Sequence, residues 1–189
     1  MVHKIFFPKL SSEDNLMRDE ATFEAIGKGT WKPFVGNQSW MGGYCRYGAA
    51  KLCAMMMMHE LQHRLNQDAA LSRICVLAVD PGYMSTGLQR SLPWLARYII
   101  FQVFFPVVAW LMPNGSIRYP EMSASYVLRA AVERGPGLGE LPKGLFFEGG
   151  KSAETSSESR DPRKRDLVWK ESVKLAHLED GETVLEGWR

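Results

Sequence analysis

The chain has 189 residues, which is enough to bury one hydrophobic core. Its composition is 46% apolar and 23% charged, as in ordinary globular proteins, and a net charge of +2 gives no reason to expect nucleic-acid binding. The N-terminus shows no basic stretch followed by an apolar one, so we expect no signal peptide and a cytoplasmic protein. The odd number of cysteines favours buried free thiols over disulfides or metal ligands at Cys45, Cys53 and Cys75.

The first predicted element is a helix over residues 46–65, which contain no Gly or Pro after Gly48 and are rich in strong helix formers. Tyr47 and Lys51 are four positions apart in its first turns, so they share one face. A phenol is protonated at neutral pH, and a fixed cation beside it favours the phenolate. Such a pair can pass a proton to a carbonyl oxygen or take one from an alcohol, although Tyr and Lys also occur at this spacing by chance.

Two other features of the same helix carry structural expectations. His59 and His63 are four apart, but no third ligand is evident, so the sequence predicts no metal site. Four consecutive methionines, Met55 to Met58, face every side of the helix. We expect them to pack on a sheet and on a neighbouring element.

Residues 74–79 form a continuous apolar run, which predicts a parallel strand buried on both faces. The following Asp80-Pro81-Gly82 ends it, since Pro and Gly interrupt strand pairing and permit a sharp turn. In open α/β sheets ligands bind outside the carboxyl ends of strands. The hydroxyls of Ser85 and Thr86 therefore fall where a cofactor would lie.

Residues 92–112 are the most apolar stretch and are long enough to cross a bilayer. The stretch is interrupted by Pro93, Arg97, Gln102 and Pro106. An arginine in the middle of a span would cost about 2.5 kcal/mol or more, which argues against one. Peripheral membrane contact remains an alternative to a role in a substrate pocket.

The remaining pattern completes an α/β arrangement. A helix is predicted from Pro120 to Val132 and a last strand over residues 144–148, which gives a strand-helix-strand unit with residues 74–79. Residues 151–165 are polar and serine-rich and are expected to form a flexible loop. An amphipathic helix over residues 167–178 closes the chain.

Three segments carry a resemblance to a known family. They are Arg46-Tyr47-Gly48-Ala49-Ala50-Lys51-Leu52, the turn Val79-Asp80-Pro81-Gly82 with Thr86 after it, and Gly144-Leu145-Phe146-Phe147 followed by Trp169-Lys170-Glu171-Ser172. With these the chain resembles the short-chain dehydrogenase/reductase family over nearly its whole length, closest to the retinol-dehydrogenase-like members of fungal metabolism. The resemblance implies the C-terminal half of a Rossmann-like, doubly wound parallel sheet, as one partial domain over residues 1–189.

The resemblance also implies a site. Tyr47 would be the general acid/base, Lys51 would favour its phenolate and hydrogen-bond the nicotinamide ribose, and NADP or NAD would be the cofactor. Residues 92–112 would be the lid over an apolar substrate, and the helix that carries Tyr47 would form a homo-oligomer interface. The implied cofactor-binding residues are Tyr47, Lys51, Pro81, Gly82, Met84 and Thr86.

The sequence departs from the family pattern in two ways. No G-x-x-x-G-x-G or G-x-G-x-x-G motif, which would hold the pyrophosphate, occurs in the 189 residues. Family chains carry a much longer segment before the tyrosine than the 46 residues found here, so we expect an N-terminally truncated member whose first residue follows the catalytic serine. Ser39, eight residues before Tyr47, is the alternative candidate for that serine.

Three functions therefore stay open. The first is an NAD(P)-dependent oxidoreductase that acts on a bulky apolar carbonyl or alcohol in secondary metabolism. The second is a catalytically inactive fragment or pseudoenzyme. The third is a cofactor-independent isomerase or cyclase that uses the Tyr47/Lys51 pair, because chemistry without hydride transfer needs no pyrophosphate site.

Overall fold

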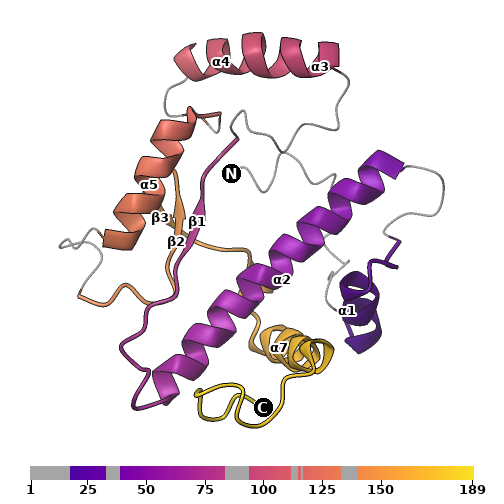
Figure 1. The fold of residues 1–189 in the computed structure, drawn as a ribbon, viewed down its shortest axis with the longest axis vertical. Helices are drawn as coiled ribbons and strands as arrows, with labels where there is room; N and C mark the ends of the chain where they lie inside the picture. The colour runs from indigo at the N-terminus through magenta and orange to yellow at the C-terminus, as the bar shows by residue number, and fades with distance from the viewer. Residues whose placement is uncertain (1–17, 33–38, 84–93, 112–114, 116, 133–139) are drawn as a thin grey trace. The chain divides into compact units, whose positions relative to one another are not determined.

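The computed structural model describes residues 18–32, 39–83, 94–111, 115, 117–132 and 140–189. The chain separates into two compact units. The helical unit comprises the described parts of Met1–Val76 and Thr155–Arg189, and the sheet unit comprises those of Leu77–Glu154. The elements carry the labels of Figure 1.

The helical unit is organised around α2, Ser39–Gln67, the longest described helix. Helices α1 (Glu20–Gly27), α6 (Ser157–Arg160) and α7 (Pro162–Ala176) all pack against it. Figure 1 shows α1 and α7 beside it. The helix predicted over residues 46–65 is confirmed and extends beyond both predicted ends. Helix α7 likewise begins before its predicted start, because Pro162 fits a first helical position and Asp161 caps the helix.

The core of the helical unit joins three helices that are distant in sequence. Phe23 of α1, Met56 of α2 and Val168 of α7 pack together with at most 5% of each side chain exposed. Of the four methionines in series, Met56 and Met58 are buried and the other two are half-buried. The cysteines are free thiols as predicted, but only Cys45 is fully buried.

A buried polar network attaches the C-terminal residues to this core. The guanidinium of Arg64 pairs with Glu60 at 3.0 Å, lies 4.8 Å from the ring centre of Trp169, and donates to the carbonyls of Gly187 and Arg189 at 2.5 and 3.2 Å. The indole of Trp169 donates to the carbonyl of Trp188 at 2.5 Å. These contacts hold the chain end against α2 and α7.

Asp68 connects the end of α2 to the same tail. One of its carboxylate oxygens accepts from the backbone N–H groups of Ala70 and Leu71, at 2.9 and 3.0 Å, and the other accepts from Glu186 N–H at 3.0 Å. The N–H groups of Glu186, Leu71 and Ala70 lower the pKa of Asp68, because hydrogen bonds to the charged form favour it.

The sheet unit has three strands in the order β1-β2-β3. Strand β1 (Ala78–Asp80) pairs in parallel with β2 (Phe146–Glu148), and β3 (Lys151–Ala153) pairs antiparallel with β2. Helix α5 (Pro120–Val132) connects the two parallel strands and contacts β1 (Figure 1). The predicted strand-helix-strand unit and the α/β class are therefore confirmed, consistent with part of a Rossmann-like fold.

Strand β1 is shorter than the run of residues 74–79 that predicted it. The side-chain amide of Gln62 on α2 donates to the carbonyl of Ile74 at 3.1 Å and accepts from Val76 N–H at 2.7 Å. These are the backbone groups that a neighbouring strand would use. A side chain therefore replaces strand pairing at residues 74–76, and the paired strand begins at Ala78.

The flexible loop predicted over residues 151–165 is wrong, because this segment contains β3, α6 and the start of α7. Its polar residues act as helix caps. Ser156 accepts from Ser159 N–H at 3.2 Å, and Asp161 accepts from Arg163 N–H at 2.9 Å. Ser159 itself is fully buried. The polarity reflects capping and local hydrogen bonds instead of disorder.

The apolar stretch within residues 92–112 is helical. Helix α3 (Trp94–Tyr98), the π-helix η3 (Ile99–Phe104) and α4 (Phe105–Leu111) follow one another without a break, and we call them together the apolar rod. Pro106 has no N–H to donate to the carbonyl four residues before it, and the wider π turn lies directly before this proline. No helix in the described part of the chain is long and apolar enough to cross a membrane.

The Asp68 contacts predict an acid-dependent stability. Asp68→Asn keeps only one acceptor oxygen, so it should lower the melting temperature near neutral pH. Because the folded-state pKa of Asp68 is lowered, its contribution is present above the ordinary value of 3.8 and is lost as the pH falls through the lower folded value. Thermal melts followed by circular dichroism should show the gap between wild type and variant closing below pH 3.8. Asp180→Asn, at an exposed ion pair, is the control; a gap independent of pH would contradict this account.

The glycines after β2 offer a second test. Gly150 has φ +76°, and a Cβ there would lie 2.8 Å from a ring carbon of Tyr126, whereas Gly181 has φ +90° with nothing within 4 Å of a Cβ. Both substitutions to Ala strain the backbone, but only Gly150→Ala also forces a packing rearrangement, which costs about 1–3 kcal/mol. Urea unfolding should show Gly150→Ala as the more destabilising variant. Equal destabilisation by Gly181→Ala would mean that the ring contact has no energetic weight.

Candidate active site

Tyr47 and Lys51 lie together on the exposed side of α2. The opposite side of the helix is buried, with Cys45 at 4% exposure and Ala49 and Met56 at 0%. Tyr47 is 55% exposed, and Lys51 is exposed beside it. The predicted pair is thus presented outward by a helix whose other face is fixed in the core.

The two side chains are in direct contact. The ammonium nitrogen of Lys51 lies 5.5 Å from the ring centre of Tyr47, which is within the range of a cation–π interaction. Among the residues that the structure describes, no carboxylate pairs with Lys51. Its three N–H donors therefore remain available to a phenolate or to a bound hydroxyl.

The turn after β1 is held by hydrogen bonds from both of its sides. The carboxylate of Asp80 accepts from Gly82 N–H at 2.9 Å, and Gly82 adopts φ +75°, which favours glycine. The hydroxyl of Ser123 on α5 donates to the carbonyl of Pro81 at 2.7 Å. These contacts fix the backbone of the Pro81-Gly82 turn where β1 ends.

Arg118 completes this support. Its backbone N–H donates to the carbonyl of Tyr83 at 2.8 Å, and its guanidinium donates to the carbonyl of Asp80 at 3.4 Å. The side chain is only 9% exposed and lies 5.4 Å from the ring centre of Tyr126. A Cβ at Gly149 would lie 2.6 Å from this guanidinium, so glycine leaves room for it.

The sequence analysis missed Arg118 and Ser123. Neither residue belongs to a spacing pattern, and both act through backbone carbonyls that are distant in sequence. The sequence offers one signal for them, which is that both are polar residues within three positions of Pro120, where α5 begins.

The structure places the predicted residues in two groups. Tyr47 and Lys51 belong to the helical unit, and Pro81 and Gly82 belong to the sheet unit. Ser39 is the first residue of α2, and the structure describes its backbone but not its side chain. The two other predicted cofactor contacts, Met84 and Thr86, lie outside the described residues, as does Ser85.

The other reactive side chains of α2 have structural roles. Burial raises the pKa of Cys53 to about 11 and also raises that of Cys45, so both thiols stay protonated at neutral pH. Burial and the nearby Arg165 and Arg160 lower the pKa of His59, whose Nε2 lies 2.8 Å from the hydroxyl of Thr155. The described residues contain no group of three side chains able to hold a metal ion.

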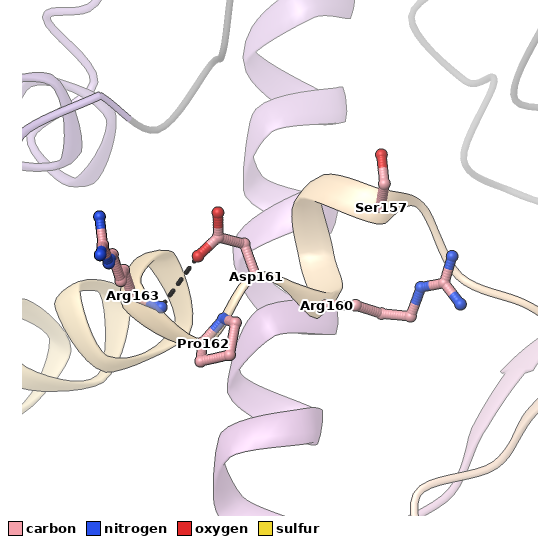
Figure 2. A pocket seen from close by; sticks show the side chains of 5 residues that line it. All are labelled: Ser157, Arg160, Asp161, Pro162 and Arg163. Atoms are coloured by element: carbon pink, nitrogen blue, oxygen red, sulfur yellow. Dashed lines mark hydrogen bonds between the residues drawn. The ribbon is translucent and has the colours of Figure 1, made fainter.

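A surface hollow at the start of α7 is lined by Ser157, Arg160, Asp161, Pro162 and Arg163. Two arginines and a helix N-terminus suggest an anion site. However, the carboxylate of Asp161 already accepts from the first N–H groups of α7. Figure 2 shows the side chains of Arg160 and Arg163 pointing to opposite sides of the hollow. The arrangement is a capped helix start and does not form a phosphate site.

Comparison with known proteins shows to which family the chain belongs. No protein-family model matches the chain. The short-chain dehydrogenase iccH of Talaromyces variabilis is 39% identical over 171 residues, which cover 87% of this chain and 46% of that protein. The chain belongs to the short-chain dehydrogenase/reductase family. A polyprenol dehydrogenase of Danio rerio is 27% identical over 135 residues, which cover 71% of this chain and 37% of that protein. The chain thus spans less than half the length of these relatives.

The hydrogen bond to the Pro81 carbonyl gives a testable prediction. Ser123→Ala removes the hydroxyl and should destabilise the chain by about 1 kcal/mol, because it leaves a carbonyl in the turn without its donor. Amide hydrogen exchange of Gly82 should speed up, since the turn opens more often. Ser125→Ala on the exposed side of α5, whose hydroxyl bonds only within the helix, is the matched control. Unchanged exchange at Gly82 in Ser123→Ala would show that this contact does not hold the turn.

Proposed function

We propose that this chain carries the proton-transfer half of an NAD(P)-dependent oxidoreductase of the short-chain dehydrogenase type, with Tyr47 as general acid/base and Lys51 as its electrostatic partner. The observation that carries the proposal is the contact of these two side chains on the exposed face of α2, opposite its buried face. Membership of the family supports the assignment of this pair to redox chemistry.

The chemistry divides between the protein and the cofactor. When bound, a nicotinamide cofactor supplies the hydride that adds to the carbonyl carbon of the substrate. The Tyr47 hydroxyl donates its proton to the carbonyl oxygen, so the alcohol forms and the phenolate remains. The Lys51 ammonium stabilises that phenolate by its charge. In alcohol oxidation the same proton returns to Tyr47.

Each unit by itself contains residues of a kind that fits a nicotinamide cofactor. An ammonium group that pairs with no carboxylate among the described residues suits the hydroxyls of a ribose, which Lys51 would hold. The rigid Pro81-Gly82 turn, with Gly82 at φ +75°, would lie along the nicotinamide end. The described residues offer no glycine-rich helix start for the pyrophosphate, and we derive no step that depends on one.

Two observations support a substrate class, the exposed apolar side chains of the rod and the name of one relative. We propose a bulky apolar alcohol or carbonyl compound. The apolar rod exposes large aromatic and aliphatic side chains, among them Trp94 and Trp110, each 75% exposed. One relative is named as a dehydrogenase of polyprenol, a long apolar alcohol. Both observations favour a substrate recognised by hydrophobic contact.

Cofactor titration tests the proposal. Calorimetric titration with NADH and NADPH should show binding to the wild-type chain, weakened about tenfold or more in Lys51→Met, because a charged hydrogen bond is worth about 1.5–3 kcal/mol. Tyr47→Phe should bind cofactor but lose about 10²- to 10⁴-fold in kcat/KM with apolar alcohols, since general acid/base catalysis is removed. Lys170→Met, at another exposed lysine, is the matched control for Lys51→Met.

The outcomes separate the three functions left open by the sequence. Absence of cofactor binding at concentrations on the order of millimolar would refute the oxidoreductase assignment for this chain. Turnover without nucleotide that still requires Tyr47 would support an isomerase or cyclase. Absence of both would support an inactive member of the family.

A further inference from the structure

The apolar rod is the largest continuous run of exposed apolar side chains in the described part of the chain. Over its 18 residues, Trp94 to Leu111, most of the described side chains are exposed. The two tryptophans near its ends are the most exposed of these, at 75% each. The other large exposed side chains include Leu95, Ile99, Phe104 and Leu111.

Exposure on this rod is not confined to one face. Residues 98–100 and 102–104 are exposed as consecutive runs, and such runs pass around a helix instead of along one side. A protein partner with a flat surface would cover one side only. An apolar medium whose molecules can close around several sides of a helix, such as the interfacial layer of a lipid bilayer, fits this exposure better.

The charge of the segment indicates which kind of lipid surface it would bind. Residues 81–120 contain no Asp or Glu and three arginines, Arg90, Arg97 and Arg118. Arg118 is buried against the Pro-Gly turn, and without any acidic residue the formal charge of this segment is positive. A positively charged apolar segment complements an anionic phospholipid surface.

The two tryptophans fit the same partner. Tryptophan side chains concentrate at membrane–water boundaries, where an apolar ring with one polar N–H is stable. The rod is attached to the rest of its unit where the hydroxyl of Tyr119 donates to the carbonyl of Pro106 at 3.2 Å. This attachment, and the polar Gln102, suit a helix that lies in the plane of the membrane and does not cross it.

We propose that the apolar rod binds the surface of an anionic phospholipid bilayer and lies in its interfacial layer, with Trp94 and Trp110 as its anchors. The inference uses the sheet unit alone and does not depend on the roles of Tyr47 and Lys51. Combined with the proposed function, it would bring the chain into contact with the phase in which apolar substrates dissolve.

Vesicle flotation of the full 189-residue chain tests this inference. The chain should float with vesicles of phosphatidylcholine and phosphatidylserine, less with phosphatidylcholine alone, and less at high salt. Trp110→Ser combined with Leu111→Ser should reduce binding about tenfold or more. Val184→Ser, at a position 83% exposed in the helical unit, is the matched control and should bind as wild type.

A fluorescence measurement locates the contact. The chain has six tryptophans, and brominated lipids should quench the emission of those that enter the bilayer. The double variant Trp94→Phe/Trp110→Phe keeps the apolar surface, so it should still float but should lose the quenching. Quenching that persists in this variant would place the contact elsewhere and overturn the proposal.

Two further outcomes would also overturn it. The first is that the wild-type chain does not float with anionic vesicles, or that Val184→Ser binds as poorly as the Trp110/Leu111 variant. The second is that gel filtration without lipid shows a dimer that Trp110→Ser dissociates while flotation is unchanged. The rod would then be an interface between copies of the chain.

Discussion

The guanidinium of Arg64 holds three separate parts of the helical unit together. It pairs with Glu60 in its own helix, lies over Trp169 of α7, and donates to the carbonyls of the last residues of the chain. Both members of the ion pair are at most 10% exposed, and a buried charge is tolerated only when its hydrogen bonds are satisfied. Among the described residues, loss of the arginine would leave buried Glu60 with only the distant Nε of Arg165, at 3.8 Å, as a cation. Such a loss costs about 3–5 kcal/mol in other proteins.

This network has a consequence for the candidate site at the other end of α2. A helix that is fixed along one face cannot rotate, so its outward face is fixed as well. Tyr47 and Lys51 are presented by that fixed face, and neither contributes to the core. The Pro81-Gly82 turn shows the same principle, because Arg118 and Ser123 use its carbonyls to hold it in place. In both units, chemically relevant groups are placed by residues that do not react.

Local patterns predicted those parts of the fold that depend on neighbouring residues in sequence. The helix carrying Tyr47 follows from its composition, and helix α5 and strand β2 follow from the Pro and Gly residues at their ends. The i, i+4 spacing identified the Tyr47/Lys51 contact. Residues 151–165 were misassigned because Ser and Asp are typical both of loops and of helix caps. Arg118 and Ser123 were missed because their partners lie 38 and 42 positions away, a distance at which sequence periodicity carries no information.

The side-chain amide of Gln62 also blocks backbone groups that could otherwise pair with a strand of another molecule. An extended segment with unpaired N–H and C=O groups is a template on which another chain can add a strand. Residues 74–76 lie just before β1, and a single side chain, that of Gln62, occupies both the carbonyl of Ile74 and the N–H of Val76, the groups that a neighbouring strand would use. Gln62 is 4% exposed and belongs to α2, so the side chain that occupies these groups is itself held in the folded helical unit. The carbonyl of Ile74 and the N–H of Val76 are thereby unavailable for intermolecular β-sheet formation, although no further strand among the described residues covers them.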